Sequence, residues 1–201
     1  MTTENISTYD DTTALLVVDV QNDFADPEGG LYVDGGEQVV PPINDQIEAA
    51  RDAGALIVYT QDWHPPETPH FEKDGGTWPV HCVRDTWGAE FHPDLDVIDA
   101  PIVKKGVDGG DGYSGFSVRD PVSGDEEATE LGSILQEAGI GEVVVTGLAG
   151  DVCVKETALD AARLGYDVTV PAALTRFVEL EEGDADRALD ELRDAGVRVV
   201  S

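Results

Sequence analysis

The chain has 201 residues, of which 41% are hydrophobic, and this length suits one globular domain with a sizeable core. It is strongly acidic, with 42 Asp and Glu against 12 Lys and Arg and a formal net charge of −30. Such a surface repels nucleic acid and anionic membranes, so both are excluded as partners. Because the acids are spread over the whole chain, we interpret them as a halophile-type solvated surface rather than an acidic tail.

Targeting signals are not evident. No apolar run approaches the length of a membrane span, and Met1 to Asn5 lacks the basic and apolar regions of a secretory signal. The two cysteines, Cys82 and Cys153, are far apart and do not suggest a disulfide framework. We therefore expect a cytoplasmic protein, either a monomer or a homo-oligomer, with residues 1–11 frayed; a small molecule as its partner is expected from the site residues described below.

Apolar runs and helical spacings alternate along the chain. The strands expected are residues 13–20, 55–60, 102–105, 142–146, 166–170 and 197–200, and the helices expected are residues 37–53, 127–138, 152–164 and 184–195. This alternation predicts right-handed βαβ units, and hence an α/β fold with a doubly wound, mostly parallel six-stranded sheet and helices on both faces. We expect residues 1–201 to form a single domain, with loops at 106–124 and, as a long functional region, at about 61–101.

Three reactive side chains are predicted to meet at one edge of this sheet, because the carboxyl ends of parallel strands carry the ligand site. Asp19 ends the first strand, Lys104 ends the third, and Cys153 follows the fourth at a helix start. A helix N-terminus there would lower the pKa of a thiol and offer donors to an oxyanion. Each residue also has a structural alternative: Asp19 as a loop cap, Lys104 as a solvated cation, Cys153 as a buried apolar side chain.

A second group of residues predicts a metal site. Asp62 and His64 lie two apart just past the second strand, so in extended chain they point the same way, and His70 and His81 follow in the same loop. Histidine and carboxylate ligands suit Zn²⁺, with Fe or Mn also possible. His92 lies beyond the cluster and is interpreted as structural.

Aromatic side chains occupy the same loops and would line a flat apolar pocket for a ring, or form a small core under the loops. Phe24 and Trp78 are the expected ring-binding pair, because they flank Asp19 and the metal residues in the sequence. Cys82 is expected to be buried packing, since a strand-like backbone would turn it away from His81.

Together these motifs resemble the nicotinamidase branch of the isochorismatase-like cysteine hydrolases, from about Ala14 to Val200. The segments that carry the resemblance are Ala14 to Phe24, Asp62-Trp63-His64-Pro65, Trp78 to Val83, Gly88 to Phe91, Lys104, Tyr113 to Phe116 and Gly147 to Val154. The Asp62 and Trp78 segments are the more specific ones, because they look like the metal site of nicotinamidases.

The resemblance implies a thiol mechanism. Asp19 would take the proton of Cys153, with Lys104 holding both, and the thiolate would attack the carboxamide of nicotinamide. The backbone N–H groups of Ala149 and Cys153 would hold the oxyanion, with a cis peptide between Leu148 and Ala149. Asp19 would then protonate ammonia, and water would hydrolyse the thioester to nicotinate, as a step of NAD salvage.

The resemblance also implies the remaining site residues. The metal would lie on Asp62, His64, His81 and His70 and would bind the pyridine nitrogen, while Phe24, Trp78 and Leu148 would contact the ring. Lys104 is chosen over Lys105 because it lies nine residues before Tyr113; a strand register shifted by one would select Lys105 instead.

Two departures from the family pattern leave the exact substrate open. Gly150 stands where the family commonly has threonine, and Val152 where it often has an aromatic residue or histidine. The alternatives are a related cysteine hydrolase acting on another amide or carbamoyl substrate, and a binding protein that keeps the fold without catalysis.

Overall fold

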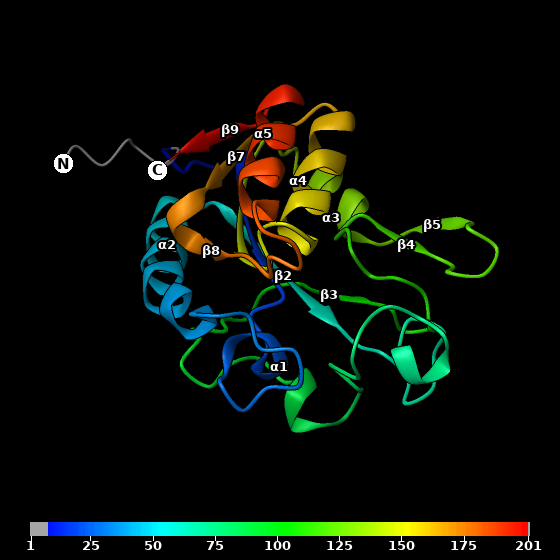
Figure 1. Cartoon of the computed structure of the whole chain (residues 1–201). Helices are drawn as coiled ribbons and strands as arrows, with labels where there is room; N and C mark the ends of the chain where they lie inside the picture. The colour runs from blue at the N-terminus through cyan, green and yellow to red at the C-terminus, as the bar shows by residue number, and fades with distance from the viewer. Residues whose placement is uncertain (1–7, 201) are drawn as a thin grey trace.

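The computed structural model describes residues 8–200 (Figure 1), so most of the segment expected to fray lies outside the described residues. The main sheet contains β1 (Thr13–Val18), β2 (Leu56–Asp62), β3 (Ile102–Lys105), β6 (Glu142–Leu148), β7 (Asp167–Pro171), β8 (Thr175–Arg176) and β9 (Arg198–Val200). The helices are α1 (Asn22–Ala25), α2 (Val40–Ala53), α3 (Leu131–Glu137), α4 (Cys153–Arg163) and α5 (Asp184–Asp194). Short 3₁₀ turns are η1 (Gly36–Val39), η2 (Glu72–Asp74), η3 (Trp87–Ala89) and η4 (Ala172–Leu174).

The main sheet is parallel and doubly wound. Its strand order is β3-β2-β1-β6-β7-β9, and the short β8 pairs with the end of β6. Every pairing in this sheet is parallel. The six strands predicted from the sequence are the six of this order, so the predicted fold class is confirmed, with β8 as an addition.

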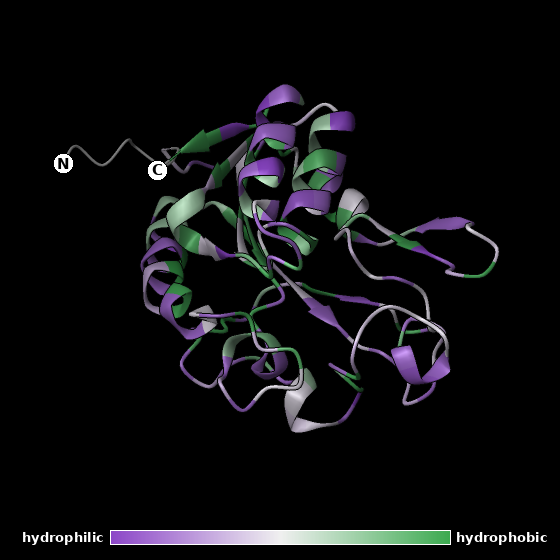
Figure 2. Ribbon diagram, in the orientation of Figure 1, coloured by the Kyte–Doolittle hydropathy of each residue, from purple (hydrophilic) through white to green (hydrophobic). Residues whose placement is uncertain are grey.

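Both faces of the sheet are buried because its side chains alternate. In β1, Leu15 and Val17 pack into one core cluster with the apolar face of α2, while Leu16 and Val18 pack into a second cluster with α3, α4 and α5. Figure 2 shows the apolar strands enclosed by helices whose outward faces are hydrophilic. Burying each such side chain contributes about 1.5–3 kcal/mol.

One predicted helix begins later than expected. Glu127 and Ala128, placed in the helix at 127–138, instead belong to β5 (Glu126–Ala128), which pairs antiparallel with β4 (Ser117–Arg119) inside the predicted loop at 106–124. The hydroxyl of Thr129 donates to the Gly115 carbonyl and accepts from the Leu131 N–H, so the helix starts only at Leu131. The β4–β5 hairpin projects from the side of the molecule (Figure 1).

The winding of the sheet reverses between β1 and β6, and this point positions the site. The strands β2 and β3 lie on one side of β1, and β7 and β9 lie beyond β6. A Cβ added at Gly147 would lie 2.0 Å from the Val18 carbonyl oxygen, so the two strand ends approach closely only because residue 147 is glycine. Parallel sheets bind their ligands outside the carboxyl ends at such a reversal.

Candidate active site

Asp19 follows β1 at the reversal point and is fully buried. Its backbone adopts φ 49°, in the left-handed region, and so turns the chain out of the strand. The Thr60 hydroxyl donates to its Oδ1 at 2.6 Å, and the Lys105 Nζ lies 2.6 Å from its Oδ2. A buried carboxylate needs such partners, so Asp19 is held in one orientation.

The lysine that reaches Asp19 is Lys105, and the prediction of Lys104 is therefore corrected. Side chains alternate along β3, so Lys105 points into the protein and is fully buried while Lys104 is exposed. The Lys104 ammonium lies 3.4 Å from the centre of the Trp63 ring, on the outer side of the strand. The one-residue register alternative described above is the one that the structure adopts.

Lys105 joins two buried carboxylates. Its ammonium lies 2.6 Å from Asp19 Oδ2 and 3.0 Å from Asp62 Oδ1, and it also donates to the Gly112 carbonyl. Asp62 Oδ1 accepts no hydrogen bond of good angle, so that contact is mainly Coulombic. Burial opposes the charge of Lys105, but Asp19 and Asp62 outweigh it and raise its pKa well above the ordinary value.

Cys153 begins α4 and lies beside Asp19. One ligand atom each of Asp19, Asp62 and Cys153 lies within 4.8 Å of the others. Burial, more than the neighbouring carboxylates, raises the pKa of the Cys153 thiol well above its usual range, although Lys105 opposes this. The expected lowering of the thiol pKa by the helix N-terminus is therefore not what the structure gives, and the thiol needs a base.

Asp19 has the properties of that base. Burial raises its pKa to about 6, with the Lys105 charge and the hydrogen bonds from Lys105 and Thr60 acting in the opposite direction. The carboxylate form therefore predominates at neutral pH, while its basicity exceeds that of an ordinary aspartate.

Backbone donors lie next to the thiol. The turn between β6 and α4 contains a cis peptide between Leu148 and Ala149, as expected from the resemblance. Within the described part of the chain, neither the Ala149 N–H nor the Cys153 N–H donates to a protein acceptor. Ala149 and Cys153 both line the same pocket, so these N–H groups are available to an oxyanion bound there.

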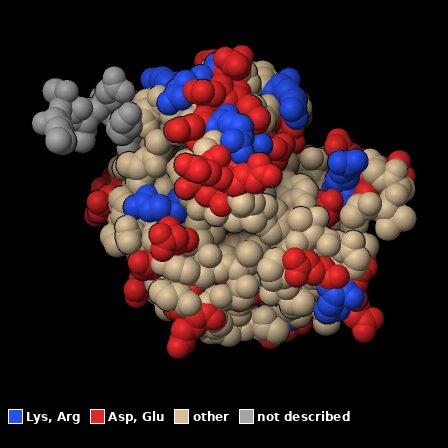
Figure 3. Space-filling model, in the orientation of Figure 1, with Lys and Arg blue, Asp and Glu red and all other residues tan. Residues whose placement is uncertain are grey.

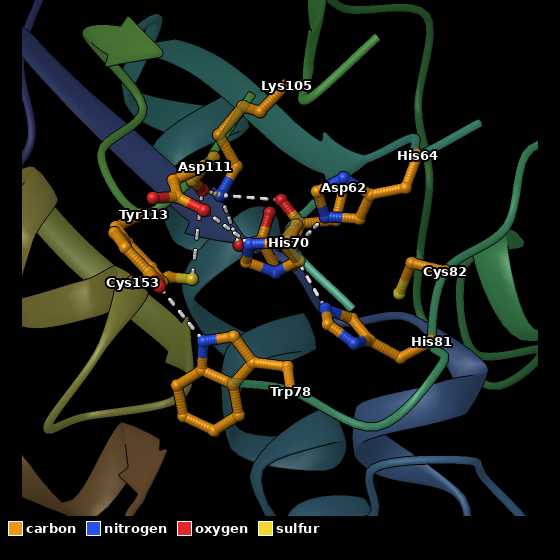
Figure 4. Close-up of polar contacts among 12 residues, drawn as sticks. Asp62, His64, His70, Trp78, His81, Cys82, Lys105, Asp111, Tyr113 and Cys153 are labelled. Carbon is orange, nitrogen blue, oxygen red and sulfur yellow. Dashed lines mark hydrogen bonds and ion pairs between the residues drawn. The ribbon is translucent and has the colours of Figure 1, made fainter. Parts of the chain in front are cut away.

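Three histidines gather beside Asp62, next to the thiol (Figure 4). One ring nitrogen each of His64, His70 and His81 lies within 4.8 Å of the others, and all three side chains are buried. Asp62 Oδ2 lies 3.6 Å from His64 Nε2 and 3.9 Å from His81 Nε2. All four residues predicted as metal ligands are therefore brought together.

The hydrogen bonds of these rings suit metal binding. His70 Nδ1 lies 2.6 Å from Asp111 Oδ1, and His81 Nδ1 lies 2.8 Å from the Pro79 carbonyl, so each can keep Nε2 free as a ligand. Neither ring nitrogen of buried His64 has a hydrogen-bond partner among residues 8–200. An unpartnered buried nitrogen in a set of three histidines and one carboxylate fits a divalent ion such as Zn²⁺.

The charges of the cluster agree with this fit. Burial opposes ionisation of Asp62, but Lys105, with His64 and His81, outweighs it and lowers the pKa of Asp62. Burial also lowers the pKa of His81 to about 4 and lowers that of His70. An ionised carboxylate beside neutral imidazoles is the protonation state that a metal ion requires.

A largely apolar pocket of about 390 Å³, its open mouth included, joins the thiol to the histidines. Phe24 and Trp78, the predicted ring-binding residues, both line it, and Trp78 donates from Nε1 to the Tyr113 hydroxyl at 2.9 Å. Leu148 does not line this pocket: it is fully buried in the core under the turn, which corrects its predicted role in substrate contact.

Several site residues have no signal in the sequence. Leu31 and Val33 line the pocket from one loop, Tyr113 and Val178 line it from two others, and Asp111 orients His70 from a distance of 41 residues. They could not be chosen because apolar or acidic residues of loops have no spacing that identifies a partner. Tyr113 lay in a quoted motif but received no role.

The two residues interpreted as structural are both buried. His92 accepts the Asp94 N–H and is not part of the histidine cluster. Cys82 belongs to the core cluster, but its backbone has φ 45° and is not strand-like, so the reason for its placement was wrong. Its N–H donates to Asp23 Oδ2 at 2.6 Å.

The parallel α/β fold and the buried cysteine beside an aspartate and a lysine define a class of hydrolytic enzyme with a thiol at the sheet reversal. Residues 13–201 match the family model described as Isochorismatase domain. The chain belongs to the isochorismatase domain family, and the expectation of an amidohydrolase is confirmed.

Known relatives of high similarity are nicotinamidases. The chain is 40% identical to the nicotinamidase/pyrazinamidase of Mycobacterium tuberculosis, over 93% of this chain and 97% of the relative. It superposes on the pyrazinamidase of Pyrococcus horikoshii, solved in complex with zinc, with TM-score 0.84, 39% identity and coverage of 94% and 99%. The crystal structure of PnC1 from L. infantum, in complex with nicotinate, superposes on the chain with TM-score 0.88, 34% identity and coverage of 97% of this chain and 96% of that one.

Proposed function

We propose that the chain is a metal-dependent nicotinamidase, which hydrolyses nicotinamide to nicotinate and ammonia through a thioester on Cys153. The observation that carries the proposal is that one pocket joins Cys153 to the histidine cluster, with aromatic walls between them. A flat ring with a nitrogen at one end and a carboxamide at the other fits such a pocket. The names of the similar proteins support the same substrate.

The first step activates the thiol. Asp19 takes the proton of Cys153, and the thiolate attacks the carboxamide carbon. Lys105 stays charged and keeps Asp19 in place, and the Ala149 and Cys153 N–H groups stabilise the oxygen as it gains negative charge. Proton transfer of this kind contributes about 10²–10⁴-fold to a rate, and each oxyanion donor about 10²–10³-fold.

The second half releases both products. The protonated Asp19 gives its proton to the departing nitrogen, the C–N bond breaks, and ammonia leaves behind a thioester. Asp19 then takes a proton from water, whose oxygen attacks the thioester carbon. Cleavage of the C–S bond releases nicotinic acid, which ionises to nicotinate in solution, and Asp19 returns its proton to the thiolate.

Asp62, His64, His70 and His81 would hold the divalent ion. When bound, the ion supplies a Lewis acid that accepts the lone pair of the pyridine nitrogen. Phe24 and Trp78 position the ring, so that the carboxamide is presented to Cys153 in one orientation. Production of nicotinate from nicotinamide would place the enzyme in NAD salvage.

The decisive experiment measures ammonia release from nicotinamide by Zn²⁺-loaded protein in high salt. Cys153→Ala is expected to abolish turnover, while Cys82→Ala, a change at the other buried cysteine, should retain it. Turnover that survives in Cys153→Ala would overturn the thioester mechanism. Activity on another amide but not on nicotinamide would favour the alternative of a related cysteine hydrolase with a different amide or carbamoyl substrate.

Metal binding is tested separately by metal analysis after dialysis. His81→Ala is expected to lose most of its bound divalent ion, since it removes one of four ligands. His92→Ala is the matched control, because His92 is also buried but lies outside the cluster. Equal metal content in the two variants would refute His81 as a ligand.

A further inference from the structure

A second hollow borders the pocket that holds Cys153. It encloses about 750 Å³, its open side included, and shares three wall residues, Trp78, Tyr113 and Val152, with the inner pocket. Its other walls come from α4, α5 and the segment between β8 and α5, including Lys155, Leu180 and Glu191. We call this space the outer hollow.

One segment builds a wall of each space. Val178 lines the inner pocket and Leu180 lines the outer hollow. The turn before Cys153 fixes this segment, because Asp151 accepts the N–H groups of Val178 and Glu179, both at 2.9 Å. The Gly150 N–H also donates to the Arg176 carbonyl at 2.7 Å. The outer hollow is therefore held in shape by the same turn that carries the thiol.

One of the three residues that separate the inner pocket from the outer hollow has a small side chain. Trp78 and Tyr113 are tied together by their hydrogen bond, whereas the third shared wall residue is Val152, whose side chain is aliphatic and makes no polar contact. A ring seated between Phe24 and Trp78, as the proposed function requires, would lie against Trp78, which is one of the three shared wall residues. The ring nitrogen, C3 (which bears the carboxamide) and C5 occupy every second position of the pyridine ring, so they point in three directions evenly spaced around the ring. With those two positions turned to the histidines and Cys153, C5 points away from both.

The charge of the outer hollow selects what it can hold. Four acids line it, Asp151, Glu156, Asp184 and Glu191, against two cations, Lys155 and Arg187. Lys155 is already paired with Glu156 at 3.4 Å and Glu191 at 3.1 Å, and Arg187 is paired with Asp184. The excess is negative, so an ammonium group is stabilised there and a carboxylate is repelled.

From this geometry we propose that the enzyme also hydrolyses ring-extended pyridine carboxamides, with a neutral or cationic group at C5 that occupies the outer hollow. The proposal rests on the proposed function for the seating of the ring. It assigns Val152 as the residue whose small side chain lets the C5 group pass from the inner pocket into the outer hollow. It assigns Leu180 and Glu191 as residues that contact the extension. An anionic extension at the same carbon is disfavoured.

The test compares kcat/KM for nicotinamide and its 5-methyl, 5-aminomethyl and 5-carboxy derivatives at one fixed KCl concentration. The methyl and aminomethyl compounds are expected within tenfold of nicotinamide, and the carboxy compound at least tenfold below the aminomethyl compound. Hydrolysis of nicotinamide without hydrolysis of any C5 derivative overturns this inference and leaves the proposed function standing. Hydrolysis of the derivatives without that of nicotinamide overturns the proposed function instead.

Variants separate the outer hollow from general damage. Glu191→Lys is expected to lower kcat/KM for the aminomethyl compound at least threefold and to raise it for the carboxy compound, with nicotinamide unchanged. Equal changes for both charged compounds would overturn the assignment. Leu180→Ser is expected to lower kcat/KM for the methyl compound alone. Leu164→Ser, which changes another exposed leucine outside the hollow, should leave that kcat/KM unchanged. Val152→Trp should lower kcat/KM for the extended compounds at least tenfold more than for nicotinamide.

Discussion

At the scale of single residues, the two adjacent lysines of β3 have opposite environments. Lys105 is buried between Asp19 and Asp62, whereas Lys104 lies over the outer face of Trp63. The same charge on neighbouring positions therefore has different consequences, and substitution can separate them.

Lys105→Met is expected to lower kcat/KM by about 10²–10⁴-fold, because Asp19 loses the cation that holds it. It should also destabilise the fold by about 3–5 kcal/mol, since two buried carboxylates are left without their cation. Lys104→Met is the matched control: it is expected to leave kcat/KM within about threefold of the parent and to lower the free energy of unfolding by no more than about 1 kcal/mol, the size of its exposed contact with Trp63. Steady-state kinetics and chemical denaturation measure both; equal losses in the two variants would contradict the assignment.

The pH dependence follows from Asp19, whose pKa burial raises to about 6. The reaction needs the carboxylate form of Asp19, so kcat/KM should reach its maximum above this pH and fall as the pH drops through it. Thr60→Val removes a hydrogen bond to the carboxylate, which should raise the pKa of Asp19 and move the acid limb to higher pH. Thr146→Val, which loses a hydroxyl bonded to the Leu16 carbonyl instead, should leave the limb in place. A limb that does not move in Thr60→Val would exclude Asp19 as the titrating group.

The sequence could place Asp19, Cys153 and the histidines, because each follows a strand or lies within one motif. It could not decide between Lys104 and Lys105, because β3 is short and the doubled lysine removes the alternation that would mark its buried face. Asp111 and Val178 were beyond reach for another reason: only the folded loops bring them to the site.

At the scale of elements, the turn between β6 and α4 is joined to the segment after β8 through Asp151. Asp151 Oδ1 accepts the Val178 N–H and Asp151 Oδ2 accepts the Glu179 N–H. Glu179 has φ 48°, in the left-handed region. A bond to a charged acceptor contributes about 1.5–3 kcal/mol. The pocket wall at Val178 therefore depends on this contact.

Asp151→Ala is expected to raise KM for nicotinamide by roughly 5- to 30-fold, because a displaced wall at Val178 would cost about 1–2 kcal/mol of substrate binding free energy. Asp120→Ala is the matched control, since Asp120 likewise accepts two backbone N–H groups, of Val122 and Ser123, in an exposed turn that does not line the pocket. Initial-rate kinetics with both variants decides the matter. A KM that rises equally in both variants, or in neither, would show that the hydrogen bonds of Asp151 do not position the pocket wall at Val178.

Helices and strands of the main sheet followed from periodicity, because burial on both faces imposes long apolar runs. The β4–β5 hairpin did not, since Glu126 and Glu127 are exposed and their pairing with Ser117–Arg119 is a backbone contact that side-chain patterns do not encode.

At the scale of the whole molecule, acidic charge dominates. In Figure 3, Asp and Glu outnumber Lys and Arg on the face shown, and they gather over the region of α5. None of the helices in the described part of the chain is long and apolar enough to cross a membrane. Self-repulsion among these acids opposes folding unless salt screens it.

The thermal midpoint is therefore expected to rise steeply as KCl is added, by screening over a Debye length of about 10 Å at 0.1 M and about 3 Å at 1 M. Neutralising the exposed Glu126 and Glu127 to Gln should raise the midpoint at low KCl and have little effect at high KCl. Calorimetry at a series of KCl concentrations measures this. A midpoint independent of KCl would refute the interpretation of the acidic surface.

The shared position of Lys105 also has an evolutionary consequence. Because one ammonium contacts both Asp19 and Asp62, loss of Lys105 leaves two buried carboxylates without their cation, whereas loss of Asp62 leaves the Lys105–Asp19 pair intact. A descendant that abandoned the metal would lose Asp62 without an unpaired buried charge and would retain selection for Lys105 through Asp19. Substitutions at positions 62 and 105 are therefore expected to appear in a fixed order, with Asp62 changing first.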